Sequence, residues 1–256
     1  MRTVIIVPTF NERQNIGRLI ESLESVFKGM AHDMHILVVD DSSPDGTMEV
    51  VRVYQRRYRN LHAIQGVKSG LGTAYIRGMN HAMDSLAADV VYEMDADFSH
   101  KPEDVPRLMA ALEQGADFAI GSRYVPGGSI PPEWGFHRKV NSATGNFVAR
   151  YLTGMYAVRD CTAGFRAIRV PVLRAINFAA LGVQGYAFQV ALLHAAASRG
   201  AKVVEIPVDF VERSAGDSKL GLRDIIEFII NASWIRFRSS RNRCRYFGCG
   251  KSGRHD

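Results

Sequence analysis

The sequence has few cysteines, and their spacing suits neither a metal site nor a disulfide framework. Cys161, Cys244 and Cys249 are the only three in 256 residues. An odd number in a chain of this length indicates a reducing compartment. Cys244 and Cys249 have no second pair of cysteine or histidine residues beside them, so a zinc site is not expected.

Long hydrophobic runs are also missing. No uncharged apolar stretch approaches the ~20 residues that a membrane-spanning helix needs. The N-terminal stretch MRTVIIVPTFNE has too short an apolar run for a signal peptide and lacks a small-residue cleavage site. We therefore expect a soluble, cytoplasmic protein.

The chain is neutral overall up to residue 235, and its whole net charge lies in the last 21 residues. The formal net charge is +6, and residues 236–256 carry seven Arg or Lys against one acid, Asp256, which is also +6. A basic tail on a neutral body indicates a polyanionic partner, membrane or nucleic acid, unless the tail only keeps the protein soluble. The chain has no nucleic-acid reader motif, so we expect no nucleic acid as a partner.

Short apolar runs alternate with amphipathic segments along most of the chain. Strands are predicted at 2–7, 34–39, 61–65, 89–94, 117–121, 164–168 and 202–207. Helices are predicted at 13–27, 45–58, 72–86, 103–114, 138–153 and 186–199. Strands that are apolar throughout and alternate with helices indicate an α/β fold, with a mostly parallel sheet covered by helices on both faces.

The segment 221–238 is predicted to form one further helix. Its polar residues fall on a narrow stripe, the rest of its circumference is apolar, and Trp234 is followed by the arginine cluster. This pattern fits an amphipathic helix in a membrane interface, and packing against the body of the protein is the alternative. We accordingly predict a domain at 1–220, an interfacial helix at 221–240 and a basic, disordered tail at 241–256.

Two acidic residues directly follow a predicted strand. Asp95 and Asp97 come after DVVYEM, at the carboxyl edge of a parallel sheet, where ligands bind in open α/β folds. Two carboxylates this close repel each other unless a cation lies beside them. Hard oxygen ligands suit Mg²⁺ or Mn²⁺ bridging the protein to a diphosphate, and solvated loop acids are the alternative.

Polar loops follow two other predicted strands. Asp40 and Asp41 begin the turn DDSSPDGT, in which Ser43 or Asp45 is expected to cap the next helix. One of the two acids is expected to be structural and the other to face a ribose or base. The third loop is PTFNE, after the first strand. Polar loops that follow three neighbouring parallel strands meet at the same edge of the sheet. Their convergence predicts a ligand-binding site there.

Several catalytic motifs are absent. The chain has no P-loop, H-E-x-x-H, G-x-S-x-G or protein-kinase motif set. The loop KSGLGTAY lacks the third glycine of a dinucleotide-binding motif, because Tyr75 stands there. We interpret it as a tight loop into a helix whose N-terminus, with Lys68, faces phosphate.

A family resemblance runs along most of the chain. The motifs PTFNE, VVDDSSPDGT, KSGLGTAY, MDADFSH, GSRY, RDCTAGFRAIR and IPVDFVERSAGDSK occur in this order. Their order and spacing resemble those of dolichol-phosphate (polyprenyl-phosphate) mannose synthases, which are inverting family-2 glycosyltransferases of GT-A fold. The first two motifs are shared by the wider family. The run GLGTAY, MDADFSH, GSRY and the late R-x-x-G-x-S-K pattern is more specific.

The resemblance implies roles for particular residues. Donor-nucleotide contacts are implied at Pro8, Phe10, Glu12, Val39, Asp41, Asp95 and Ala96, and metal ligation at Asp95 and Asp97. Asp97 and Arg123 are implied as catalytic residues, and phosphate-holding cations at Arg123, Arg213 and Lys219. Arg138, after a proline-rich turn, is expected to guide the acceptor phosphate.

This sequence departs from the family pattern at three places. Phe10 stands where tyrosine is usual, which removes a hydroxyl but keeps an aromatic ring for stacking on the base. Ser99 stands where some relatives have a metal-binding glutamine. The C-terminal membrane-spanning helices of some relatives are missing, so the protein is expected to be peripheral through its own tail or to depend on a membrane-anchoring subunit.

The implied reaction is attack of a polyprenyl-phosphate oxygen on the anomeric carbon of GDP-mannose, with inversion. The nucleophile is already an anion near neutral pH, so no general base is required. A UDP-sugar donor is the alternative within the same fold. The sequence fits a nucleotidyltransferase less well, because such an enzyme would have a phosphate-binding loop near the first strand and PTFNE is not one. A non-catalytic module that binds a nucleotide sugar or a polyanion is the alternative outside enzymes.

Overall fold

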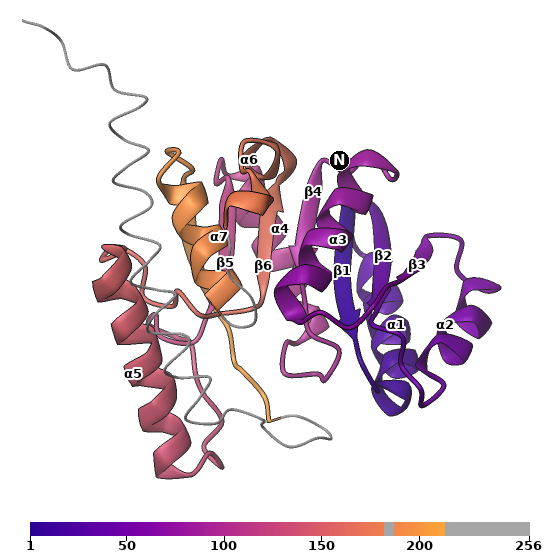
Figure 1. Ribbon diagram of the computed structural model, residues 1–256, viewed down its shortest axis with the longest axis horizontal. Coiled ribbons are helices and arrows are strands. Elements are labelled where there is room, and N and C mark those ends of the chain that lie inside the picture. The colour runs from indigo at the N-terminus through magenta and orange to yellow at the C-terminus, as the bar shows by residue number, and fades with distance from the viewer. Residues whose placement is uncertain (182–186, 213–256) are drawn as a thin grey trace, which may run out of the picture.

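The core of the molecule is a seven-stranded sheet with the order β3-β2-β1-β4-β6-β5-β7 (Figure 1). The computed structural model describes residues 1–181 and 187–212. Its strands are β1 (Arg2–Thr9), β2 (Asp33–Asp40), β3 (Leu61–Gln65), β4 (Val90–Glu93), β5 (Phe118–Ser122), β6 (Arg166–Arg169) and β7 (Val203–Pro207). Only β6 runs against its neighbours, β4 and β5. The predicted mostly parallel sheet is therefore confirmed.

Helices lie on both faces of this sheet (Figure 1). They are α1 (Arg13–Phe27), α2 (Thr47–Gln55), α3 (Leu71–Asp84), α4 (Val105–Glu113), α5 (Phe136–Thr153), α6 (Val170–Arg174) and α7 (Ala187–Ala197), with 3-10 turns at Pro102–Asp104 and Phe178–Ala180. Side chains alternate across the sheet, so Val4 and Ile6 of β1 join the core under α3 and α7. Ile5 and Val7 join the core under α1 and α4. Burial on both faces explains why the strands are apolar throughout.

The predicted elements are present, with small changes at their ends. Helix α2 begins at Thr47 rather than 45, because Gly46 has a φ of 90° and cannot belong to a right-handed helix. The N-cap position is Gly46, so neither Ser43 nor Asp45 caps the helix as expected. The Asp45 carboxylate, one residue earlier, accepts a hydrogen bond from the backbone N–H of Thr47 at 3.0 Å. The predicted helix at 221–238 and the boundaries at 221–240 and 241–256 lie outside the described residues.

The antiparallel direction of β6 brings the segment before it to the edge of the sheet where the polar loops lie. Because β6 is antiparallel to β4 and β5, its first residue, Arg166, lies opposite Glu93 and Ile120 near the carboxyl ends of those strands. The segment that leads into β6 therefore enters the sheet at the same edge as the polar loops.

None of the helices in the described part of the chain is long and apolar enough to cross a bilayer.

Candidate active site

The loops after β1 and β2 are tied together by hydrogen bonds. Asp40 is fully buried and accepts hydrogen bonds from the Thr9 and Ser43 hydroxyls at 2.9 and 2.6 Å. The backbone N–H of Glu12 donates to Thr47 Oγ1 at 3.0 Å, while its carboxylate accepts from the Asn15 amide. Asp40 is thus the structural acid of the pair. The backbone of PTFNE is held beside the second loop.

Asp41 is the second acid of the pair, and its partner comes from α3. Arg77 Nη2 lies 2.5 Å from Asp41 Oδ1, and the Asp41 side chain is only 9% exposed. Gly66 permits this approach, because a Cβ there would lie 2.1 Å from Arg77 Nη1. Arg77 and Gly66 received no role from the sequence, since 36 residues separate Arg77 from Asp41.

Phe10 and Lys68 meet from two different loops. Lys68 Nζ lies 3.5 Å from the centre of the Phe10 ring, which is a cation–π contact. This contact brings the cation of the third loop to the aromatic ring of the first. The predicted donor residues Phe10, Glu12, Asp41 and Lys68 are therefore linked through neighbouring loops, and Pro8 and Val39 are paired in the β1–β2 register.

The Asp95–Ala96–Asp97 turn lies at the carboxyl end of β4, as predicted. Asp97 is 7% exposed and its Oδ1 accepts from the backbone N–H of Ser99 at 3.0 Å. The backbone N–H of Asp95 donates to His100 Nδ1, and Phe98 adopts a positive φ of 62°. The turn therefore has a defined shape before any ligand binds.

A buried tyrosine of α3 is hydrogen-bonded to Asp95. The Tyr75 hydroxyl, from α3, donates to Asp95 Oδ1 at 3.3 Å. Burial, together with the charges of Asp95 and Glu93, raises the pKa of Tyr75, so the phenol keeps its proton and acts as a donor. Glu93 lies behind the turn, 3.7 Å from Arg166. Burial raises the pKa of Glu93 to about 7, against the opposing charge of Arg166.

The residues of this turn suit a divalent cation bound with a diphosphate. Asp95 and Asp97 supply carboxylate oxygens, and the buried Ser99 hydroxyl has no hydrogen-bond partner among the described residues. In that part of the chain, no group of three or more His, Cys, Asp or Glu is arranged to hold a metal. Mg²⁺ commonly takes one or two carboxylates and fills its remaining positions with water and substrate phosphate.

Arg123 is held in a buried ion pair with Asp160. Its Nε and Nη2 each lie 2.8 Å from the Asp160 carboxylate, and Nη2 also donates to Thr162 Oγ1 at 2.9 Å. Burial alone would raise the pKa of Asp160, but the Arg123 charge and hydrogen bonds outweigh it and lower that pKa. Arg123 is therefore a fixed, fully charged cation.

The remaining predicted cations are only partly described. Arg138 donates to Glu212 at 2.5 Å and stacks on Trp134 at 4.0 Å from the ring centre. This pairing brings the end of the described chain to the first turn of α5. Arg213 and Lys219 lie outside the described residues.

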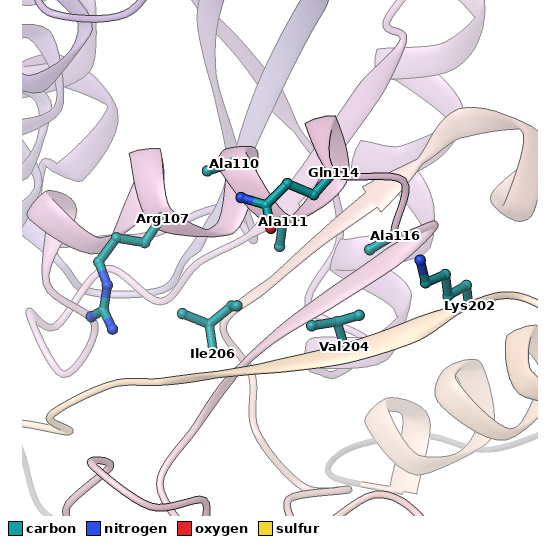
Figure 2. Close-up of a pocket in the computed structure, with 8 residues that line it drawn as sticks. All are labelled: Arg107, Ala110, Ala111, Gln114, Ala116, Lys202, Val204 and Ile206. Atoms are coloured by element: carbon teal, nitrogen blue, oxygen red, sulfur yellow. The ribbon is translucent and has the colours of Figure 1, made fainter.

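A separate depression lies between α4 and β7 (Figure 2). Its volume is about 190 Å³, and none of the predicted site residues lines it. Val204 and Ile206 of β7 face α4 across its apolar centre, and Arg107 and Lys202 lie near its two ends. It has no carboxylate and is distinct from the site at the β4 end.

Comparison with known proteins identifies the class of enzyme to which this fold belongs, a glycosyltransferase. A family profile described as Glycosyl transferase family 2 matches residues 4–176. The chain belongs to this family, and the expected glycosyltransferase activity class is confirmed. The GT-A fold is confirmed by a solved glucosyl-3-phosphoglycerate synthase from Mycobacterium tuberculosis in complex with Mn²⁺ and UDP-glucose. The TM-score is 0.66 at 18% identity, covering 91% of this chain and 78% of that one.

Two curated relatives are similar over nearly the whole chain. A polyprenol monophosphomannose synthase of Mycolicibacterium smegmatis is 42% identical over 248 residues, covering 94% of this chain and 90% of the relative. An undecaprenyl-phosphate mannosyltransferase of Micrococcus luteus is 38% identical, covering 91% of this chain and 93% of the relative. The resemblance stated from the motifs is therefore confirmed.

Proposed function

We propose that the protein transfers mannose from GDP-mannose to a polyprenyl phosphate, with inversion, to give polyprenyl-phosphate mannose. The observation that carries this proposal is the shaped Asp95–Ala96–Asp97 turn beside the donor loops. It occurs in a chain 42% identical to a polyprenol monophosphomannose synthase. The acceptor class includes dolichyl and undecaprenyl phosphate, since both present the same phosphate to the enzyme.

The donor occupies the loops after β1, β2 and β4 in this proposal. Pro8, Val39 and Ala96 provide backbone and apolar walls, and Phe10 stacks on the base. Glu12 and Asp41 accept hydrogen bonds from the base or ribose, which is consistent with the anchoring of their loops. Lys68, already beside Phe10, faces the donor phosphates.

Asp95 and Asp97 are proposed to hold Mg²⁺ or Mn²⁺. The cation would neutralise charge on the departing nucleoside diphosphate. The chain's own contribution is a turn held in shape by Ser99 N–H and by the Tyr75 hydroxyl. Little reorganisation is then needed when the donor binds.

The acceptor phosphate requires cations rather than a base. A phosphate monoester is already ionised near neutral pH, so its oxygen attacks the anomeric carbon without losing a proton to the protein. Arg123, fixed by Asp160, is proposed to orient the phosphates and stabilise charge in the transition state. Arg138, Arg213 and Lys219 are proposed to hold the acceptor or donor phosphate.

The cellular setting follows from the lipid acceptor. We place the protein peripherally on the cytoplasmic face of a membrane, held by the 221–240 segment and the basic tail or by a membrane-anchoring subunit. Both substrates are then reached from one side, the donor from solution and the acceptor from the bilayer. No nucleic acid takes part.

The decisive test is transfer of labelled sugar into an organic-extractable polyprenyl phosphate. GDP-mannose, UDP-glucose and UDP-N-acetylglucosamine would be compared with Mg²⁺, Mn²⁺ or EDTA. We expect EDTA-sensitive product from GDP-mannose alone, with a β linkage by NMR. Product only from a UDP-sugar would overturn the mannose assignment. Folded protein with no lipid-linked product from any donor would overturn the proposed acceptor.

A further inference from the structure

Arg77 is a cation of α3 that lies beside the proposed donor loops. Its Nη2 lies 2.5 Å from Asp41 Oδ1, and the Arg77 side chain is 25% exposed against 9% for Asp41. The backbone N–H of Asp41 donates to the carbonyl of Thr9 at 3.0 Å. Asp41 and Arg77 are therefore held next to the loop that carries Phe10, at the edge of the space proposed for the base.

Two glycines allow the guanidinium to occupy this position. Gly78 follows Arg77 on α3, which packs on β1 and β2 (Figure 1). A Cβ at Gly78 would lie 2.7 Å from Ile6 Cγ2 and 3.0 Å from Val39 Cγ2, so glycine lets the helix lie close on the sheet. Gly66 follows β3, and a Cβ there would lie 2.1, 2.3 and 2.8 Å from Nη1, Cζ and Nε of the arginine. Close packing thus fixes the place of this side chain.

The hydrogen bonds of this pair are incomplete within the described residues. Arg77 donates to Asp41 Oδ1 through Nη2, and its Nε is buried there without a partner. A buried arginine that serves stability alone normally has its donors satisfied by carbonyl or carboxylate oxygens. The ion pair uses Oδ1 of Asp41 and leaves Oδ2 as an acceptor, next to further N–H donors on the guanidinium. The pair can therefore offer a ligand an acceptor and a donor side by side.

An acceptor beside a donor matches one type of nucleobase edge. Guanine, hypoxanthine and uracil each present a ring N–H next to a keto oxygen. Adenine and cytosine present the reverse, a ring nitrogen without a proton next to an amino group. For a base held in one orientation, the reversed edge would set acceptor against acceptor and donor against donor, which leaves buried polar groups unpaired.

We infer that Arg77 is a specificity-determining residue that selects a keto base in the donor nucleotide. Arg77 donates to the keto oxygen, and Asp41 Oδ2 accepts from the neighbouring ring N–H of a base stacked on Phe10. Because Arg77 already occupies Oδ1, Asp41 does not also hold the 2-amino group of guanine. The inference rests on the donor site of the proposed function and extends it to a residue with no counterpart among the sequence motifs. It applies to guanine and uracil donors alike.

The test is titration calorimetry of the full-length protein with GDP, IDP and ADP in the presence of Mg²⁺. IDP and ADP differ only in the keto or amino group at C6 and in the proton at N1. We expect IDP to bind at least about tenfold more tightly than ADP. GDP should bind within about threefold of IDP, because the 2-amino group has no partner.

The arginine is tested by Arg77→Met. The ratio of IDP to ADP affinity should fall to within about threefold, with the ADP affinity nearly unchanged because the contacts to the diphosphate remain. Gly66→Ala keeps the arginine and only displaces its guanidinium, so it should lower the same ratio without removing a charge. Arg174→Met makes the same change in an exposed ion pair with Asp84 and should leave the ratio unchanged.

Three results would overturn the inference. They are equal affinities for IDP and ADP in the unsubstituted protein, an unchanged ratio in both folded variants, and a strong preference for GDP over IDP. The last would mean that Asp41 holds the 2-amino group. No binding of any of the three nucleotides would overturn the proposed donor site and this inference with it. Normal base preference without sugar transfer to a lipid would contradict the proposed function alone and would support the role of Arg77.

Discussion

The donor loops and helix α5 are stabilised in opposite ways. The loops after β1, β2 and β4 are braced by hydrogen bonds between side chains and backbone, such as Thr9 to Asp40 and Ser99 to Asp97. Helix α5 is anchored on one face and presents aromatic side chains on the other. A small polar ligand needs groups fixed within a fraction of an ångström. Large apolar side chains that face outward together on one helix mark a broad interaction surface and not a polar ligand site.

The largest effect should come from removing an acid of the β4 turn. We expect Asp97→Ala to lower kcat/KM by at least about 10³-fold, because the cation and the departing diphosphate lose their carboxylate partner. Asp84→Ala, the same substitution at a 64% exposed side chain, is the matched control and should keep activity. Near-normal turnover by a folded Asp97→Ala protein would remove Asp97 from the catalytic residues.

The next effect is on stability, at the Arg123–Asp160 pair. Asp160→Asn leaves a buried guanidinium without its counter-charge, and we expect a loss of about 3–5 kcal/mol in the free energy of unfolding in urea. Asp84→Asn breaks the exposed pair with Arg174, whose side chains are 55% and 64% exposed, and should cost less than about 1 kcal/mol. Equal losses in the two variants would show that the buried pair has no special role.

A smaller effect is predicted at Gly66. A methyl group there would push the Arg77 guanidinium away from Asp41. We expect Gly66→Ala to raise the donor KM by about tenfold, with a change in unfolding free energy of less than about 1 kcal/mol, because a flexible side-chain end can move. Gly145→Ala is the control, since a Cβ at Gly145 has no atom within 4 Å. An unchanged donor KM would separate Arg77 from donor binding.

The smallest effect lies away from both regions, in β3. Burial lowers the pKa of His62, and the nearby His35 adds to this. The folded protein therefore binds fewer protons than the unfolded chain near pH 6, so this contribution to stability is present above the unfolded pKa and is lost as pH falls. We expect the stability of His62→Gln to fall less between about pH 8 and pH 5.5. Identical slopes would assign the pH dependence to other groups.

The strands and the acidic turn were predictable because their signals are local. An apolar run of about four to eight residues bounded by turn residues marks a buried strand. The carboxyl end of such a strand marks a ligand edge. Asp95, Asp97 and the β1 and β2 loops were found in this way, and the structure adds that Asp40 is the structural acid and Asp41 the partner of Arg77.

The partners of these residues were not predictable, because they come from distant parts of the chain. Asp160 reaches Arg123 across 37 residues, and it does so because β6 runs antiparallel between β4 and β5. No periodicity in a four-residue strand indicates its direction. The aromatic spacing on α5 is visible in the sequence, but a stripe of this kind is ordinarily the buried face of a helix.

The sequence by itself determined the succession of strands and helices, the acidic turn and the family, since each depends on residues close together or on an ordered set of motifs. Only the tertiary structure decided that Arg123 pairs with Asp160 and that Arg77 pairs with Asp41. It also decided that the aromatic face of α5 is exposed. The physical reason is that pairing and burial depend on which distant segments pack together, and that is settled by the whole sheet rather than by any one segment.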